Sequence, residues 1–466
     1  MKFLDRREEL ARLDRMVSGS DGRLAVLHGR RRVGKTRLLV EWVTRHGGVY
    51  TVADQSAPDV QLRYFAQSFA AVFPGFADVE YPDWTSLLAR LAREAVAARW
   101  RGPLVIDELP YLARGSPEIA SILQRWIDHD ARAAGLKVAL AGSSQRMMQG
   151  LVLSANAPLY GRAHTSFEVK PLPVSELSHA FGARSAVEVV ALYTAWGGIP
   201  RYWELASDVA EDVLDQVEQL VLDPLGPLHT EPDRLLLEEL PPAVELRPVL
   251  DAIGSGAHRV SEIAGRIGRP ATALARVLGR LQELSLVRRE TPFGEHDRNG
   301  KRSLYKLNDP FIRLWFRVVA PHRGQLVSGR RAQRMKLLRA SWPQLAAMAW
   351  EELCCSRIQY LSERAALSRL GAWRPGARWW RGNQPEWDLV TETEDRKNLL
   401  VAEAKWSDRP FERKELERLS REVASRPLPD GKHEAVRALF VPTVATGVPR
   451  EIGGVHVLTG AHILGV

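Results

Sequence analysis

The chain has 466 residues, which is too long for one ordinary hydrophobic core and predicts roughly two to four domains. Its charged start, MKFLDRREEL, is unlike a signal peptide, and no apolar run approaches the roughly 18 residues that span a bilayer, so we expect a cytoplasmic protein with no membrane partner. The net charge of +9 suggests a polyanionic partner, and the adjacent Cys354 and Cys355 exclude an ordinary structural disulfide.

The first strong motif is GRRRVGKT, which follows the apolar strand pattern RLAVLH and precedes the helix pattern TRLLVEWV. This order of strand, loop and helix is typical of a P-loop, in which successive backbone N–H groups surround the phosphates of a nucleotide. Lys35 would reach the β- and γ-phosphates of ATP, and Thr36 would ligate Mg²⁺. The residues expected to contact the nucleotide are Gly29, Arg30, Arg31, Arg32, Val33, Gly34, Lys35 and Thr36. The three arginines could add positive potential near the phosphates or face solvent.

The stretch PLVIDE predicts a buried strand that ends in two carboxylates. Asp107 fits the position that holds Mg²⁺, and Glu108 is placed to polarise a water for attack on the γ-phosphate. A strand that merely ends in acidic turn residues is the alternative. The later stretch LKVALAGSSQRM predicts another buried strand, after which Ser143 or Ser144 could sense the γ-phosphate, although an ordinary Gly-Ser turn would look the same.

Strand and helix patterns alternate through this first part of the chain. The further expected elements are strands at 47–54 and 166–172 and helices near 57–73, 84–100 and 117–133. Such alternation predicts an α/β fold with a parallel sheet, right-handed crossovers and helices on both faces. The expected phosphate and Mg²⁺ ligands then meet at the carboxyl ends of the strands, so we expect an ATPase core at residues 1–175.

Three short stretches resemble ATPases of a known group. FLDRREEL, residues 3–10, looks like the opening of many AAA-like and STAND-like ATPases, where this segment lies near the adenine. PLYGR and GGIPRYW resemble two signatures of the archaeal-type ATPases, which also occur in bacteria. The resemblance implies a helical lid at 176–242, with Gly198 and Pro200 closing over the nucleotide. It makes Arg162 a candidate catalytic arginine in cis or in trans, although a surface arginine after a turn would look the same.

A winged helix-turn-helix is predicted at residues 243–320, after a boundary at Pro241-Pro242. Three helix patterns, RPVLDAIGSG, VSEIAGRIG and RPATALARVLGRLQELSLV, precede a hairpin pattern, VRRETP and RSLYKLND. In such a fold the third helix enters the DNA major groove and the wing touches the backbone. The basic residues expected at DNA are Arg269, Arg276, Arg280, Arg288, Arg289 and Lys301. A packing or relay module without DNA contact is the alternative.

The last predicted domain, residues 321–466, opens on a basic run without any acidic residue, RGQLVSGRRAQRMKLLR at 323–339. This run could be a solvated basic helix or a surface that contacts DNA phosphates. A further helix is expected at 342–361, and it carries Glu351.

The stretch VAEAKW contains an acid and a base two residues apart on a short expected strand, so Glu403 and Lys405 should lie on the same face. They could form a solvated ion pair or half of a metal-dependent nuclease centre. Asp388 is expected to end the preceding strand, which gives the arrangement called PD-(D/E)xK. There Asp388 and Glu403 could hold Mg²⁺, while Lys405 orients the attacking water or neutralises charge on the phosphate. Glu351 could be a further carboxylate, and Glu386 could replace Asp388.

The archaeal-type ATPases that the chain resembles carry a C-terminal region related to PD-(D/E)xK nucleases, so the resemblance implies a restriction-endonuclease-like α/β domain. The main hypothesis is an ATP-hydrolysing protein that acts on DNA and has an Mg²⁺-dependent nuclease-like tail. The alternative is a regulatory, STAND-like ATPase whose nucleotide state switches DNA binding or assembly into a homo-oligomer, with an inactive tail. A chaperone-like ATPase is weaker, because it would need neither the basic run nor the acidic residues of the tail.

Overall fold

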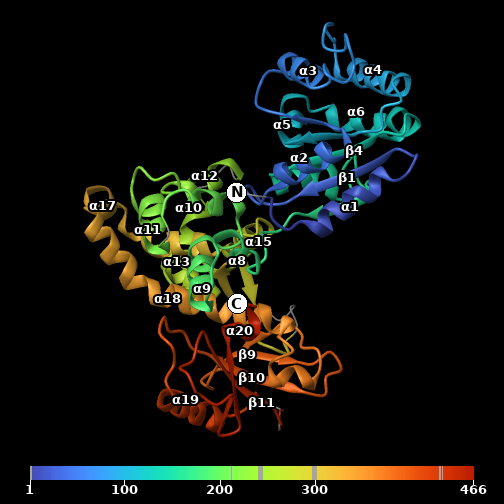
Figure 1. Ribbon diagram of the computed structural model, residues 1–466. Helices are drawn as coiled ribbons and strands as arrows, with labels where there is room; N and C mark the ends of the chain where they lie inside the picture. The colour runs from blue at the N-terminus through green and yellow to red at the C-terminus, as the bar shows by residue number, and fades with distance from the viewer. Residues whose placement is uncertain are drawn as a thin grey trace. The chain divides into compact units, whose positions relative to one another are not determined.

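The computed structural model describes residues 3–210, 212–239, 245–295, 302–429, 432 and 434–465. They form two compact units, Met1–Leu172 with Ile199–Arg201, and Pro173–Gly198 with Tyr202–Val466 (Figure 1). The predicted boundary at Pro241-Pro242 and the candidate DNA contact Lys301 lie outside the described residues. The division of the second unit into lid, winged helix and tail stays a prediction. Within the described part of the chain, no helix is long and apolar enough to cross a membrane.

A parallel sheet of five strands, in the order β2-β3-β4-β1-β5, forms the centre of the first unit. The strands are β1 (Arg23–His28), β2 (Val49–Val52), β3 (Pro103–Asp107), β4 (Lys137–Gly142) and β5 (Thr165–Glu168). The central strands β3 and β4 are buried along their whole length, which is typical of parallel strands that are covered on both faces. The predicted α/β fold with a parallel sheet is confirmed.

Helices pack around the sheet of the first unit. They are α1 (Arg7–Val17), α2 (Lys35–His46), α3 (Pro58–Gln67), α4 (Trp84–Ala97), α5 (Leu109–Gly115), α6 (Ile119–Trp126) and α7 (Gln145–Met148), and the π-helical segment η1 (Ile127–Ala131) continues α6. Asp83 caps the start of helix α4, because its side chain accepts a hydrogen bond from Ser86 N. Helices α3 and α4 lie side by side in Figure 1, and Phe65 meets Trp84 edge-to-face with their ring centroids 5.4 Å apart. The packed sheet thus fixes the loops at its carboxyl edge.

The second unit begins with helices and a hairpin. The helices are α8 (Glu176–Phe181), α9 (Ala186–Trp196), α10 (Pro200–Ser207), α11 (Val213–Val217), α12 (Glu231–Glu239), α13 (Arg247–Gly254), α14 (Val260–Ile267) and α15 (Leu274–Glu283). Strands β6 (Val287–Glu290) and β7 (Leu304–Leu307) pair antiparallel. Helix α14 ends at Gly268 with φ 64°, as its predicted stop requires. Helices α13 to α15 and the hairpin therefore follow the predicted order of three helices and two strands.

The basic run at 323–339 spans α17 (Ala320–Ser328) and the start of α18 (Arg331–Arg357), after the short helix α16 (Pro310–Leu314). Three of its arginines form ion pairs with acidic residues of the preceding helical segments. The pairs are Arg323 with Asp233, Arg331 with Asp215 and Glu218, and Arg334 with Glu218 and Asp223. Much of the run therefore holds the helices together, and Lys336 and Arg339 remain exposed.

The C-terminal part of the second unit contains a mixed sheet in the order β12-β13-β11-β10-β9-β8. Its elements are β8 (Ala377–Trp379), β9 (Trp387–Glu392), β10 (Leu399–Ala404), α19 (Arg413–Ser425), β11 (Val436–Val441), β12 (Glu451–Ile452), β13 (Val455–Thr459) and α20 (Gly460–Ile463). Strand β10 runs antiparallel to β9 and parallel to β11. The prediction that Asp388 ends a strand was wrong: a loop with Gly382 and Pro385 interrupts the pattern, so Asp388 lies at the start of β9.

Candidate functional site

The P-loop connects the end of β1 to the start of α2 in the first unit. Gly29 and Gly34 have φ of 139° and 93°, and Arg32 also adopts a left-handed conformation with φ 68°. Lys35 is 5% exposed, and its Nζ donates hydrogen bonds to Gly29 O at 2.8 Å and to Arg30 O at 3.1 Å. The loop therefore wraps around the lysine ammonium, and Val33 is buried inside it.

The expected Mg²⁺ ligands Thr36 and Asp107 lie together at the carboxyl edge of the sheet. Thr36 Oγ1 donates to Asp107 Oδ2 at 2.8 Å, and Tyr50 Oη donates to the same oxygen at 2.8 Å. Burial and the nearby Asp107 carboxylate raise the pKa of Tyr50, so its hydroxyl stays a donor. A buried carboxylate beside a threonine hydroxyl suits Mg²⁺, which prefers hard oxygen ligands. The residues present therefore fit the ion.

Glu108 lies next to this pair and is held by the neighbouring strand. It has a left-handed backbone with φ 53°, which is uncommon for a residue with a side chain and frequent at functional sites. Its Oε2 accepts hydrogen bonds from Ser143 Oγ at 2.9 Å and from Ser143 N at 3.2 Å. Glu108 and Ser143, which were predicted from two separate strand patterns, are thus in direct contact.

Pro200 and Arg162 lie at different edges of the first unit. A methyl group on Gly34 would be 3.6 Å from Pro200 Cγ, so Pro200 is next to the P-loop. Arg162 precedes β5 and lies at the amino edge of the sheet, where its Nε is 2.9 and 3.0 Å from the Asp128 carboxylate oxygens. Because a nucleotide on the P-loop would lie at the opposite edge, this position does not suit a contact in cis.

Arg6 is a buried contact of the P-loop that no local pattern singled out. Its Nη2 donates to Val33 O and to Lys170 O, both at 2.7 Å, and its Nη1 bonds Glu9. Arg31 of the loop hydrogen-bonds the hydroxyl of Tyr111. Arg31 was expected at the nucleotide as part of GRRRVGKT, whereas Arg6 lies in FLDRREEL, a segment that was expected near the adenine without a role for this residue.

Three acids from different elements gather in the C-terminal part of the second unit. Asp388 is at the start of β9 and Glu403 near the end of β10, and the antiparallel pairing brings these two positions to the same edge. Asp388 Oδ2 accepts from Ala404 N at 3.0 Å. Burial and the nearby Asp388 carboxylate raise the pKa of Glu351, on α18, to about 7.

Both oxygens of Glu403 are engaged by basic side chains. Lys405 Nζ lies 2.6 Å from Oε2, and Arg426, at the end of α19, bonds Oε1. Glu403 is 3% exposed, and burial together with Asp388 raises its pKa. Arg426 also stacks over the Trp387 ring at 5.0 Å. Lys405 and Arg426 thus neutralise the Glu403 carboxylate.

The predicted metal ligands of the tail do not fit a metal ion in this arrangement. Asp388 and Glu403 would have to offer free carboxylate oxygens, but Lys405 and Arg426 occupy those of Glu403. Among the residues that the structure describes, no three His, Cys, Asp or Glu side chains are placed to hold a metal. Glu386 pairs instead with Arg378 at 3.1 Å.

The residue next to Glu351 forms a second buried ion cluster. Glu352 accepts hydrogen bonds from Arg313 at 2.7 Å and from the Tyr193 hydroxyl at 2.9 Å, and Arg288 of β6 lies 3.0 Å away. This cluster joins helices α9, α16 and α18 to the hairpin. Although burial opposes the charged form, Arg288 and Arg313 lower the pKa of Glu352 to about 2.

This shift predicts an acid-sensitive contribution to stability. The pKa of Glu352 is lower in the folded chain than in the unfolded one, so its contribution is present above the unfolded value of 4.5 and is lost as the pH falls toward 2. Between pH 5.5 and 3.5 the loss should be about 1 kcal/mol. Glu352→Gln should lower the free energy of unfolding at pH 5.5 by about 3 kcal/mol and remove this part of the pH dependence. Urea denaturation of the wild-type and Glu352→Gln chains at both pH values measures the free energies of unfolding. An equal change with pH in the two chains would contradict the prediction.

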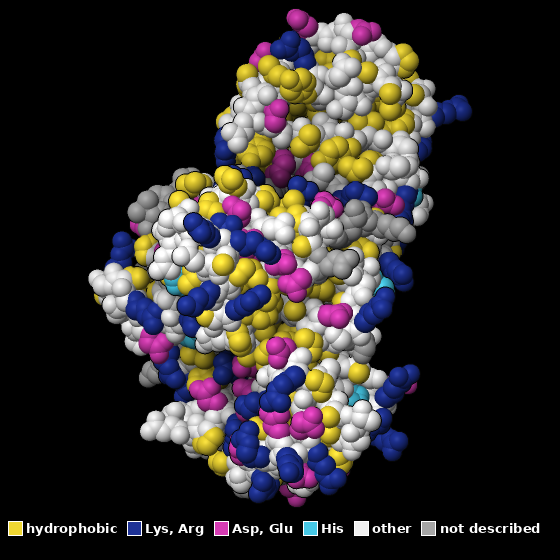
Figure 2. Space-filling model, turned by 60° about the vertical axis from the view of Figure 1, so that its left-hand side comes forward, with side chains coloured by type: hydrophobic (Ala, Val, Ile, Leu, Met, Phe, Trp, Pro, Cys, Tyr) yellow, Lys and Arg dark blue, Asp and Glu magenta, His cyan; other side chains and the backbone are white. Residues whose placement is uncertain are grey.

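The arginines expected at DNA differ in how accessible they are. Arg288 is engaged by Glu290 and Glu352, so it is not placed to contact DNA. Arg289 donates to Ser303 Oγ at 2.7 Å, and Arg280 is half-buried. Arg269 is exposed, and the Arg276 side chain is 86% exposed with Glu245 3.4 Å away. Figure 2 shows basic and acidic side chains interspersed on the face it presents.

Comparisons with known proteins match two separate segments of the chain to two families. Residues 3–205 match an ATPase domain predominantly from Archaea, and residues 315–419 match a family of archaeal and bacterial proteins of unknown function. An uncharacterized protein of Methanocaldococcus jannaschii is 29% identical over 409 residues, which cover 87% of this chain and 88% of that protein. Residues 3–205 thus contain an ATPase domain of the archaeal type.

Two solved structures are similar to parts of the chain. The Walker-type ATPase of Pyrococcus abyssi is 22% identical with a TM-score of 0.49, and the alignment covers 68% of this chain and 96% of that one. The ORC2 protein of Aeropyrum pernix, solved as ADPNP–ADP complexes, is 13% identical with a TM-score of 0.48, covering 73% of this chain and 96% of that one.

Proposed function

We propose that the first unit binds ATP with Mg²⁺ and hydrolyses it. The observation that carries this proposal is the meeting of the P-loop, the Thr36–Asp107 pair and the Glu108–Ser143 pair at one edge of the sheet. Backbone N–H groups of the P-loop and the Lys35 ammonium would bind the phosphates. Thr36 and Asp107 would hold Mg²⁺, which neutralises phosphate charge when bound.

Glu108 is the proposed general base. Its carboxylate can accept a proton from the attacking water, and Ser143 fixes the orientation of that carboxylate through two hydrogen bonds. Ser143 would also sense the γ-phosphate, and Pro200 would limit access to the P-loop. Arg162 could act only in trans, on the nucleotide of a second copy, and this role requires a homo-oligomer.

Phosphate release from ATP by the purified chain, with Mg²⁺ and with excess EDTA, tests the proposal. Release should require Mg²⁺ and should vanish in Lys35→Ala, because that change removes the buried ammonium at the centre of the loop. Release that persists in Lys35→Ala at the wild-type rate would refute the assignment of the P-loop.

We also propose that the second unit binds DNA through the exposed arginines of its helical part. Arg269 and Arg276 lie before and on α15, the helix that follows α14 in the predicted winged helix. Their exposure and the net charge of +9 support the proposal. The nuclease-like tail would then act on the same DNA, provided that Arg426 leaves Glu403. In the regulatory alternative Arg426 stays paired with Glu403, and the tail binds DNA without cleaving it.

DNA binding should be electrostatic. Its affinity should fall roughly 10³-fold between 50 and 200 mM salt if six or more phosphates are contacted. The double change Arg269→Glu, Arg276→Glu should weaken binding at least about tenfold by reversing two exposed charges. Arg63→Glu with Arg93→Glu, two exposed arginines of α3 and α4 in the first unit, is the matched control. Fluorescence anisotropy with a labelled duplex measures the affinities, and an affinity that does not change with salt would refute a DNA surface.

A further inference from the structure

A cavity of about 340 Å³ lies at the amino edge of the sheet of the first unit, opposite to the edge that carries the P-loop. It is lined by the starts of β1 and β4, by the end of η1 and by the segment before β5, and it opens to solvent at the exposed side chains of Arg132 and His164. Its apolar lining consists of Leu24, Ile127, Ala131, Leu136, Val138 and Ala163. Its volume is within the range of small-molecule sites, roughly 300–1,000 Å³.

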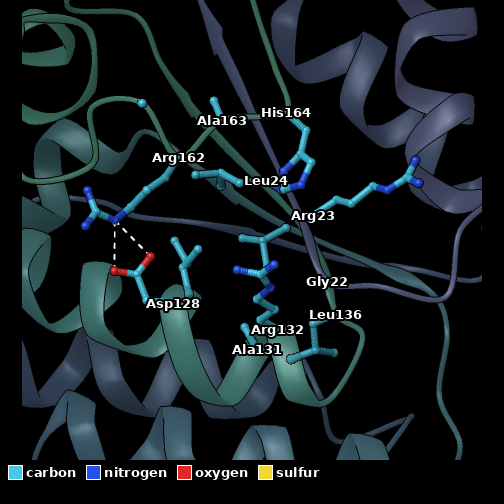
Figure 3. Close-up of a pocket in the computed structure, with 13 residues that line it drawn as sticks. Gly22, Arg23, Leu24, Asp128, Ala131, Arg132, Leu136, Arg162, Ala163 and His164 are labelled. Atoms are coloured by element: carbon cyan, nitrogen blue, oxygen red, sulfur yellow. Dashed lines mark hydrogen bonds and ion pairs between the residues drawn. The ribbon is translucent and has the colours of Figure 1, made fainter.

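The polar lining of this cavity is strongly basic. It contains three arginines and one acid, Asp128, whose carboxylate is already paired with Arg162. Arg23 donates to the carbonyl oxygen of Arg15 at 2.7 Å, so its charge is not neutralised by that contact. Among the residues that the structure describes, no acidic side chain pairs with Arg132. In Figure 3 Arg132 extends from the end of η1 toward the strands, between the Arg162–Asp128 pair and His164.

His164 adds a neutral hydrogen-bond donor to the same wall. Its Nδ1 lies 3.2 Å from Leu24 N, and because that backbone N–H donates, Nδ1 carries no proton. The proton of the neutral ring is therefore on Nε2. Partial burial, and after it the nearby Arg23 and Arg132, lower the pKa of His164, so its ring is neutral at neutral pH.

We propose that this cavity binds a small phosphate monoester with an apolar body, of the class of a mononucleotide. The Arg132 guanidinium and the His164 Nε2–H would bind the phosphate, since a guanidinium pairs with phosphate through two parallel hydrogen bonds. The wall around Ile127 and Ala163, whose side chains are only partly buried, would take the ring of the ligand. None of the residues that would contact the ligand is among those that bind the nucleotide at the P-loop, so the ligand would not compete with ATP.

AMP and inorganic phosphate, each titrated calorimetrically into the full Lys35→Ala chain, test the proposal without a contribution from the P-loop. One AMP per chain should bind, and inorganic phosphate should bind more weakly because it lacks the apolar body. Arg132→Glu should weaken AMP binding at least about tenfold, the loss expected for one charge-assisted contact. Ala163→Phe should weaken it too, by filling the cavity without changing its charge.

The control is Arg125→Glu, which makes the same charge change at an exposed position of α6 that does not line the cavity. Equal losses in Arg125→Glu and Arg132→Glu would overturn the site, as would absence of AMP binding to the Lys35→Ala chain. Phosphate that binds as tightly as AMP would overturn the apolar part of the proposal. If AMP does not bind but Arg132→Glu dissociates an oligomer in sedimentation experiments, the cavity receives an acidic side chain of a second copy, and the small-molecule proposal is refuted.

Discussion

Glu108→Gln is expected to bind ATP about as tightly as the wild-type chain and to lose roughly 100-fold or more of its turnover. The amide has nearly the shape of the carboxylate, and its carbonyl oxygen can still accept the hydrogen bonds from Ser143 Oγ and N. It cannot take a proton from water at neutral pH. The change therefore removes the base and leaves the phosphate-binding groups, Lys35 above all, in place.

ATP affinity by equilibrium titration and turnover by phosphate release separate the two effects. Glu118→Gln is the matched control, because Glu118 is an exposed acid at the start of α6 that contacts none of the site residues described. Turnover at the wild-type rate in Glu108→Gln would show that another group is the base. A loss of ATP binding in Glu108→Gln would show instead that the residue supports the loop and not the chemistry.

The sequence predicted the parts of the nucleotide site that are built from local patterns. Lys35 and Thr36 follow a strand and open a helix, and Asp107 ends an apolar run, so the three residues meet because parallel strands end at the same edge of a sheet. The contacts of Arg6 with Val33 O, and of Tyr50 with Asp107, could not be predicted. They join residues far apart in the chain, and neither residue has a spacing that indicates its partner.

In the second unit the positions of the charged residues could be predicted from local patterns, but most of their partners could not. Glu403 and Lys405 were predicted to meet because they are two apart on a strand, and they lie 2.6 Å from each other. Arg426 joins them from the end of α19, and nothing in the spacing of α19 relates it to β10. Arg288 was expected at DNA because it is basic and in the wing, but the fold turns it toward Glu352.

The last expected result concerns Arg426 and the acids of the tail. Arg426→Ala should raise the affinity of the chain for Mn²⁺ about tenfold or more, because it frees Oε1 of a nearly buried carboxylate whose like-charged neighbour is Asp388. Isothermal titration calorimetry measures this without any need for DNA cleavage. Arg421→Ala, on the same helix and exposed, is the control.

If the tail is a nuclease, Arg426→Ala should also increase metal-dependent cleavage of plasmid DNA, and Asp388→Ala or Glu403→Ala should abolish it. Lys405→Ala should reduce cleavage strongly and leave Mn²⁺ affinity unchanged or higher, because the lysine offers no ligand atom while protonated. ATP turnover should survive all four changes, since the two sites share no residue. Cleavage by the Asp388→Ala, Glu403→Ala double variant would remove the nuclease proposal. If Arg426→Ala and the wild-type chain bind Mn²⁺ with equal affinity, then Arg426 does not compete with the metal ion for Glu403.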